Sequence, residues 1–523
     1  MPLVFAMLIK KKTRRCRPYD RTDFAGCYAG AKAKRQRLAP PAMSGLYAKT
    51  ERIAKAGGVL VLPLCGFPPD RAGGAGGRHL LLAGGADFMK QENVKILKYA
   101  AVFAVTLIAF WLLLFLSALI PNSAIRSNME QSADTYKELS TYEFVNGNKF
   151  NSVADHYADA LWLNIAWNMG EGNSLKSVIQ TDYYNGEGLG ENAGLYLTIT
   201  EGKAPNTDYT RYWHGTAMFI RLGHLFTDVE GVKLIGLITF LLLAGLSLVI
   251  LVQKKHGDLA VMLALSLAAV QIWNIRLSME YQPAFILAFV FVPLFLLLER
   301  RGDQWLTGLS VASGTAVAFF DFLTTETVTI LLPLALVVAV RAKENRLGSL
   351  KENLLLLLKC GICWAASYGG AYVVKWLIAS MVTGKNAFSL ALNSAGMHAL
   401  GATTVNFDPQ GLPNSWIDGL LSSLSAMLGS ELRVDYSRIA AVLFAGFLIM
   451  FSVWYLLRRK KSNSVALPLM ILGGLVLARF ILLNNHTYMH CFFTYRALAT
   501  LVFALLSAIW LNIELPQKKG RRK

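Results

Sequence analysis

Long, continuous apolar segments dominate this 523-residue chain and limit the folds open to it. Hydrophobic residues make up 54% of the chain and charged residues 16%, whereas soluble globular chains carry about 25% charged residues. The apolar residues fall into runs and do not alternate with polar ones, and about 20 such residues in a helix cross a bilayer. We therefore predict an all-α polytopic membrane protein.

The runs predict about ten transmembrane helices. Their approximate ranges are 99–120, 233–252, 257–275, 283–298, 305–320, 327–340, 354–379, 438–457, 464–483 and 497–513. Those at 283–298, 305–320 and 327–340 are short and marginal alone, so they need partner helices or tilt. The first run is longer than the core of a signal peptide, and we interpret it as a membrane anchor.

Lysine and arginine in the short connections set the orientation, because cytoplasmic loops of membrane proteins are enriched in both. With the N-terminus inside, the inner connections are 253–257, 299–304, 341–353, 458–463 and the tail from 514, and they hold 17 basic residues. The short outer connections at 274–282, 321–326 and 484–496 hold Arg276 and Arg496. This bias predicts that both termini are cytoplasmic.

The orientation divides the chain into segments with different roles. They are a cytoplasmic start with the first helix (89–120), a large extracytoplasmic loop with amphipathic helices (121–232), helices 2–7 (233–379), a second extracytoplasmic loop (380–436), helices 8–10 (437–513) and a basic cytoplasmic tail (514–523). The predicted location is the plasma or inner membrane of a bacterial cell.

Residues 1–88 differ in composition from the rest. They hold 16 basic and 5 acidic residues and contribute +11 of the net charge of +19. They show no lasting periodicity, and Met89 leads directly into the first apolar run. We expect a disordered basic extension or a translated upstream region. A basic tail attracted to anionic lipid is the alternative.

Two aspartates follow the first span within the large loop. Asp155 and Asp159 are four residues apart, so on a helix they share one face. The residues up to Trp167 give this helix a broad apolar surface, and we expect it to lie on the bundle or at the lipid interface. A solvated helix face, or the preference of acids for helix N-termini, is the alternative explanation. We treat both as candidate catalytic residues.

Further polar residues are predicted to gather at the same outer mouth. The candidate substrate-binding residues are Arg211, His214, Arg276, Glu280, Asp321, Arg479, His486, His490, Tyr495 and Arg496. Arg211 and His214 either bind a phosphate or sugar hydroxyl or belong to an interfacial aromatic belt. Arg479 lies inside a predicted span, where an ionisable group usually faces a cavity or a partner.

Known motifs for metals, redox chemistry and nucleotides are weak or missing in the sequence. The spacing of His486 and His490 could hold a divalent metal on a helix, but it lacks the glutamate of a HExxH site. Cys360 and Cys363 form a CxxC inside an apolar run, where helix packing is the simpler reading. No P-loop, Rossmann fingerprint or nucleic-acid module occurs, so we expect no nucleic-acid partner and no evident cofactor.

Several of these segments resemble the GT-C superfamily of polytopic membrane glycosyltransferases. The resemblance covers about residues 89–515 and is carried by Asp155 with Asp159-Ala-Leu-Trp-Leu-Asn164, Arg211-Tyr-Trp-His214, Phe320-Asp-Phe-Leu-Thr-Thr325 and Asn485-His-Thr-Tyr-Met-His490 with Phe493-Thr-Tyr-Arg496. It implies transfer of a sugar from a polyprenyl-phosphate carrier to a glycan or lipid acceptor on the outer face. A first-loop carboxylate would act as base, and Asp155 is its first candidate. Many relatives place two acids adjacent or one residue apart, so the spacing here leaves open which one acts.

Two other functions remain open from the sequence. The first is a transporter or flippase for a lipid-linked sugar, although we find no two-fold repeat of the kind common in transporters. The second is an envelope polysaccharide polymerase, ligase or assembly protein. Ser380–Tyr436 contains few basic residues, which argues mildly against a polymerase with an arginine-rich outer loop.

Mass spectrometry of the mature protein tests the interpretation of the first 88 residues. We expect peptides from Met89 onward to be abundant and peptides from residues 1–88 to be missing. Abundant peptides from residues 1–88 would show that this segment is retained.

Overall fold

The computed structural model describes residues 76–147, 149–186, 188–400, 416–429, 443–448, 451–452 and 463–512. The chain forms two compact units, Met1–Leu81 and Leu82–Lys523. Every element below belongs to the second unit, except for the first residues of helix α2. The helix continues through residues 76–88, which we had placed in the extension, and residues 1–75 lie outside the described part.

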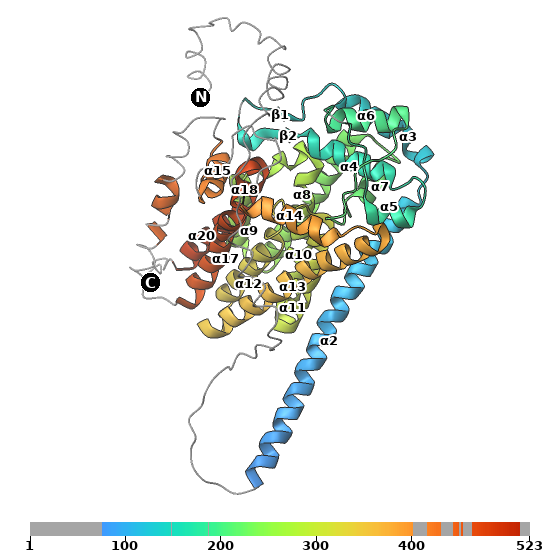
Figure 1. The fold of residues 1–523 in the computed structure, drawn as a ribbon. Helices are drawn as coiled ribbons and strands as arrows, with labels where there is room; N and C mark the ends of the chain where they lie inside the picture. The colour runs from blue at the N-terminus through green and yellow to red at the C-terminus, as the bar shows by residue number, and fades with distance from the viewer. Residues whose placement is uncertain are drawn as a thin grey trace, which may run out of the picture. The chain divides into compact units, whose positions relative to one another are not determined.

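The described chain is mostly helical, as predicted. After α2 (Gly76–Ala118), the first loop carries α3 (Asn122–Tyr136), β1 (Tyr142–Phe144), η3 (Phe150–Ser152), β2 (Val153–Asp155), α4 (His156–Asn168), α5 (Ser174–Gln180), α6 (Glu191–Glu201) and α7 (Ala217–Gly223). The first half of the bundle has α8 (Val229–Gln253), α9 (Gly257–Ala269), η4 (Ile272–Leu277), η5 (Met279–Tyr281), α10 (Pro283–Leu298) and η6 (Glu299–Arg301). The rest has α11 (Asp303–Phe320), α12 (Val328–Lys343), α13 (Leu350–Thr383), α14 (Ala387–Leu400), α15 (Asp418–Met427), α17 (Asn463–Leu482), α18 (Asn484–Met489), α19 (Cys491–Thr494), η7 (Tyr495–Ala497) and α20 (Leu498–Asn512). Figure 1 shows α3–α7 gathered at one end of the bundle.

Within the described residues, six helices are long and apolar enough to cross a membrane. They are Val94–Ala118, Val229–Gln253, Met279–Arg301, Leu350–Thr383, Val465–Leu482 and Cys491–Asn512. The predicted spans at 257–275, 305–320 and 327–340 correspond to the shorter or less apolar helices α9, α11 and α12, which pack within the same bundle. The span at 438–457 lies mostly outside the described residues, so ten spans remain a prediction.

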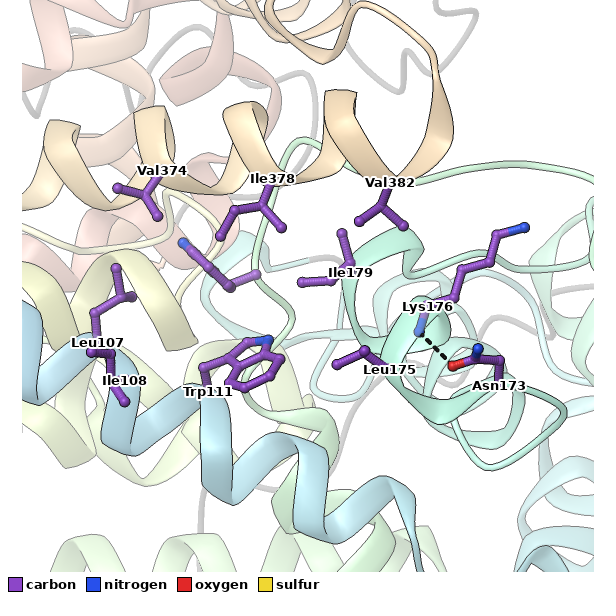
Figure 2. A pocket seen from close by; sticks show the side chains of 11 residues that line it. Leu107, Ile108, Trp111, Asn173, Leu175, Lys176, Ile179, Val374, Ile378 and Val382 are labelled. Carbon is purple, nitrogen blue, oxygen red and sulfur yellow. Dashed lines mark hydrogen bonds between the residues drawn. The ribbon is translucent and has the colours of Figure 1, made fainter.

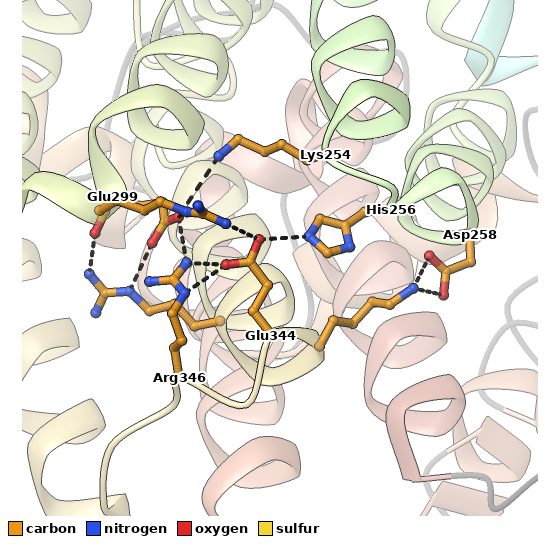
Figure 3. Close-up of polar contacts among 9 residues, drawn as sticks. Lys254, His256, Asp258, Glu299, Glu344 and Arg346 are labelled. Carbon is orange, nitrogen blue, oxygen red and sulfur yellow. Dashed lines mark hydrogen bonds and ion pairs between the residues drawn. The ribbon is translucent and has the colours of Figure 1, made fainter.

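Three connections predicted to be cytoplasmic meet at one end of the bundle (Figure 3). Glu299, whose side chain is fully buried, pairs with Arg346 at 2.6 Å and with Arg341 at 3.4 Å. Glu344 Oε1 pairs with Arg300 Nη2 at 2.7 Å and lies 3.1 Å from His256 Nε2. These ion pairs tie together the α8–α9, α10–α11 and α12–α13 connections, which places them on a common side, as the basic-residue count requires.

The first loop is attached to the opposite end of the bundle through backbone carbonyl groups. Gly215 N donates to the Phe319 carbonyl at 3.0 Å. The Thr216 hydroxyl donates to the Phe320 carbonyl at 2.9 Å, and the Trp213 indole donates to the Ala371 carbonyl at 2.9 Å. The end of α11 and the middle of α13 therefore fix the position of the Arg211–Gly215 segment.

A buried arginine closes the junction between the first span and the loop. Arg221 is fully buried and donates to the carbonyls of Ser117, Ile120 and Ala166 and to the Asn122 side chain. The last carbonyls of a helix lack partners within the helix. This guanidinium bonds one of them, Ser117, at the end of α2, and also the Ile120 carbonyl just beyond the helix. Burial lowers the pKa of Arg221 to about 10, which still leaves it charged at neutral pH.

Helix α4 was expected to lie on the bundle or at the lipid interface. Twelve of its residues are buried and Tyr157 alone is partly exposed. The reason is that α3, α6 and α7 pack around it. The helix that follows Asp155 is therefore the core of the loop domain and does not lie at the lipid interface.

Replacing Gly215 with alanine tests the attachment of the loop. A Cβ atom at this position would lie 2.2 Å from the Phe319 ring and 2.7 Å from the Phe319 carbonyl oxygen, and the backbone cannot easily move away. We expect Gly215→Ala to destabilise the protein by about 1–3 kcal/mol, as overpacking generally does, measured by thermal unfolding in detergent. The matched control is Gly361→Ala in α13, where nothing lies within 4 Å. Equal unfolding midpoints for the two variants would contradict this attachment.

Candidate functional site

Asp159 is a fully bonded carboxylate at the end of the bundle that carries the first loop. It is fully buried and accepts from the Tyr136 hydroxyl at 2.9 Å, the Ser278 hydroxyl at 2.8 Å and Met279 N at 2.7 Å. Lys233 Nζ lies 3.0 Å from Oδ2, the oxygen that also accepts from Tyr136, and its side chain is buried too. Four donors from α3, α8 and the η4–η5 segment thus neutralise Asp159. These bonds indicate a structural role, although it was a catalytic candidate.

Asp155 has a different environment. It ends strand β2 and is the N-cap of α4, where one carboxylate oxygen accepts from Ala158 N at 2.9 Å. The two aspartates therefore do not share a helix face, because Asp155 precedes the first turn. Among the described residues, this is the one hydrogen bond to its carboxylate. Burial raises the pKa of Asp155 to about 8, and the charge of Asp159 adds to this shift.

A further acid, Glu280, interacts electrostatically with both Asp155 and Asp321. Glu280 is half-buried and its carboxylate has no hydrogen-bond donor among the described residues, while the charges of Asp155 and Asp321 both act on it. Asp321 follows α11 and is bonded to the backbone and hydroxyl of Thr324. Burial raises the pKa of Asp321 to about 7, and the charge of Glu326 contributes to the same shift. Among the described residues, none of these three acids forms an ion pair with a basic side chain.

The predicted substrate-binding residue Arg479 is engaged by the protein itself. Its guanidinium pairs with both oxygens of Glu326 at 2.8 Å and donates to the carbonyl of Leu323 at 2.6 Å. Leu323 has a left-handed backbone conformation, with φ of 65°. Arg479 therefore holds the 321–327 loop in place and has little capacity left to bind a substrate.

Arg496 is a buried arginine that uses only part of its hydrogen-bonding capacity within the described residues. Its Nη1 donates to the Phe492 carbonyl at 3.2 Å, whereas Nε and Nη2 have no partner among the described residues. The guanidinium lies over the Tyr281 ring, 4.9 Å from the centroid, and the Tyr281 hydroxyl donates to the Val153 carbonyl on β2. Arg496 is thereby linked through one ring to the strand that carries Asp155.

The other predicted residues are distributed around this centre. Tyr495 is fully buried and donates to the carbonyl of Val270, which indicates a packing role. Arg276 is exposed and has no ion-pair partner among the described residues. The rings of His486 and His490 are 4.8 Å apart. No group of three histidine, cysteine or acidic residues suited to a metal occurs within the described ranges.

Arg211 and His214 lie behind an aromatic layer. Arg211 donates to the hydroxyls of Tyr209 at 2.7 Å and Ser394 at 2.9 Å. His214 is buried, and burial together with the charge of Lys375 holds its pKa well below the usual range. The ring of Phe322, next to Asp321, lies 4.6 Å from the His214 ring. His214 is thus a neutral, packed histidine separated from the carboxylates by Phe322.

Two large pockets in the described part are apolar. One, of about 530 Å³, lies between α2, α5 and α13 and is lined by aliphatic side chains with Trp111, and Lys176 stands at its edge (Figure 2). The other, of about 680 Å³, lies between α2, α7, α8 and α10, and its lining includes Met279 and Gln282 on either side of Glu280 and Tyr281. The second pocket therefore adjoins the acidic centre.

Sequence reasoning missed the partners that distinguish the two aspartates. These are Tyr136, Lys233 and Ser278, and Lys233 has the clearest signal because it is the one lysine within the apolar helix α8. Comparisons with models of protein families, with curated proteins and with solved structures gave no match.

The pairing of Asp159 with Lys233 predicts a large effect of its removal. Asp159→Asn leaves a buried lysine without its carboxylate, and breaking a buried pair typically lowers stability by about 3–5 kcal/mol. Glu230→Gln is the control, because Glu230 also pairs with Lys233 but has a side chain that is 57% exposed, and exposed pairs contribute about 0–1 kcal/mol. Thermal unfolding in detergent compares them, and equally small effects would contradict a structural role for Asp159.

Proposed function

We propose that this protein transfers a sugar from a polyprenyl-phosphate carrier to a hydroxyl of a glycan or lipid acceptor at the outer face of the membrane. The environment of Asp155 is the observation that supports this proposal most strongly. The neighbouring acids Asp159 and Glu326 are neutralised by Lys233 and Arg479. Asp155 has a single backbone donor and a pKa of about 8, and a general base works best when its pKa lies near the working pH.

The chemistry needs one base and one anion-binding group. Asp155 takes the proton of the acceptor hydroxyl as the oxygen attacks the anomeric carbon of the sugar. The bond from that carbon to the phosphate oxygen breaks, and its electron pair leaves with the polyprenyl phosphate. The free Nε and Nη2 of Arg496 are suited to that phosphate, because guanidinium donates paired hydrogen bonds to phosphate oxygens.

The apolar pocket beside Glu280 supports a lipid-linked donor. Its lining is almost entirely hydrophobic, with Phe110 and Phe219 on one side and Ile286 on the other. A prenyl chain in this pocket would gain the free energy of apolar burial, about 0.8 kcal/mol per CH₂ group at most. Its phosphate end would then lie near Met279, next to the acidic centre.

A transfer assay tests the proposal with the purified full-length chain in liposomes and radiolabelled polyprenyl-phospho-sugars. We expect labelled sugar to move to an acceptor, and Asp155→Asn to lower the rate by about 10²–10⁴-fold, the usual contribution of a general base. Asparagine is as good an N-cap as aspartate, so the α4 cap should survive. The control is Asp134→Asn, an exposed acid of the same loop that pairs with Lys137. Full activity of Asp155→Asn would refute the role, and no transfer by wild-type protein with any donor would refute the function.

The raised pKa of Asp155 also predicts a pH profile. Below its pKa of about 8 the carboxyl group keeps its proton and cannot act as base. We therefore expect kcat/KM to increase with pH and to level off above about pH 8. Rates measured between about pH 6 and pH 9 check this, with thermal unfolding at each pH as the stability control. A rate that falls over this range would contradict Asp155 as the base.

A further inference from the structure

A third pocket of the described residues, of about 320 Å³, differs from the apolar ones in chemistry. It lies at the outer end, between the turn after β1, the start of η4 and the end of α15. Its polar lining consists mainly of uncharged groups, with one lysine and one tryptophan. They are Asn146, Lys149, Asn151, Ser152, Gln271, Trp273 and Asn274. We name it the amide pocket.

Gln271 organises the amide pocket. Its side-chain oxygen accepts from the Tyr495 hydroxyl at 3.1 Å and from Asn151 Nδ2 at 3.3 Å, and its amide donates to the Ala269 carbonyl at 2.9 Å and the Met427 carbonyl at 3.3 Å. Its backbone is left-handed, with φ of 45°, which is uncommon for a residue other than glycine. Such strained residues cluster at binding sites, where surrounding contacts hold them in place.

Several amide groups of the pocket are left without protein partners. Asn274 Nδ2 donates to the Asn151 carbonyl at 2.8 Å, but its Oδ1 has no donor among the described residues, and neither does Asn151 Oδ1. The exposed Asn146 side chain makes no hydrogen bond within the same part of the chain. Side-chain amides offer both donors and acceptors, which matches a ligand with many hydroxyl groups better than an anion.

Trp273 adds a flat apolar surface to these amides. Its side chain is 53% exposed beside the pocket. The carbon–hydrogen face of a sugar ring packs well on an indole, while its hydroxyls need the neighbouring polar groups. A membrane-interface anchor is the other use of an exposed tryptophan, but it would not require the amides.

The amide pocket adjoins the proposed reaction centre through two connections. Ser152 lines the pocket and is followed by strand β2, which ends at Asp155. Tyr495, which bonds Gln271, is followed by Arg496. We infer that the amide pocket binds a carbohydrate, and that this carbohydrate is the acceptor, so the second half of the inference rests on the proposed function.

Saturation-transfer NMR with the full-length protein in nanodiscs tests carbohydrate binding directly. The probes are free lactose, maltose and chitobiose. We expect at least one to bind wild-type protein, and Asn274→Ala and Trp273→Ala to weaken it about tenfold, as expected for lost hydrogen bonds and ring contact. Asn146→Ala, at an exposed side chain, serves if the other variants fail to fold. Trp305→Ala is the matched control, because Trp305 is 46% exposed at the start of α11, away from the pocket.

The outcomes separate this inference from the proposed function. Asp155→Asn should bind the saccharide like wild type, since it removes a base and leaves the amide pocket intact. Failure of all three saccharides to bind wild type, or unchanged binding in the pocket variants, would overturn the amide pocket even if sugar transfer is observed. Saccharide binding without any sugar transfer would support carbohydrate binding by the amide pocket and refute the proposed transferase function. A higher acceptor KM with unchanged kcat in Asn274→Ala would support both the acceptor role of the amide pocket and the proposed transferase function.

Discussion

The ion pair between Asp159 and Lys233 is the interaction on which the junction between the first loop and the helical bundle depends. A carboxylate and an ammonium group are both removed from water there, which is unfavourable unless every remaining donor and acceptor is satisfied. The Tyr136 hydroxyl, the Ser278 hydroxyl and a backbone amide supply those bonds. Because these partners come from the loop and from the bundle, the pair joins the two and fixes the first turn of α4.

That fixed turn determines what Asp155 can do. As the N-cap of α4, it is buried, it is held by one backbone amide, and its charge acts on Glu280. Desolvation and neighbouring negative charge both favour the protonated form. Two carboxylates four residues apart thus have different roles: Asp159 is a neutralised structural group and Asp155 is able to exchange a proton near neutral pH.

Hydrophobic run length predicted the helical membrane fold, and the basic-residue count predicted which connections lie together. Both are local properties of a sequence in a bilayer. The complete burial of α4 was not predicted, because it depends on three loop helices that no periodicity in α4 can reveal. Arg479 and Arg496 were both substrate-binding candidates in the sequence. Glu326 neutralises Arg479, whereas Nε and Nη2 of Arg496 have no partner among the described residues. Pairings between distant residues depend on tertiary structure, so sequence patterns named the candidates but could not rank them.

Infrared titration of the Asp155 carboxyl group tests the central claim most directly. The difference spectrum between wild-type protein and Asp155→Asn isolates the C=O stretch of one protonated carboxyl group in the full-length protein. We predict that this band is present at neutral pH and disappears with a midpoint near pH 8. A carboxyl group already ionised at pH 6, in the usual manner of an exposed aspartate, would contradict the assignment of Asp155 as the proton-exchanging acid of the site.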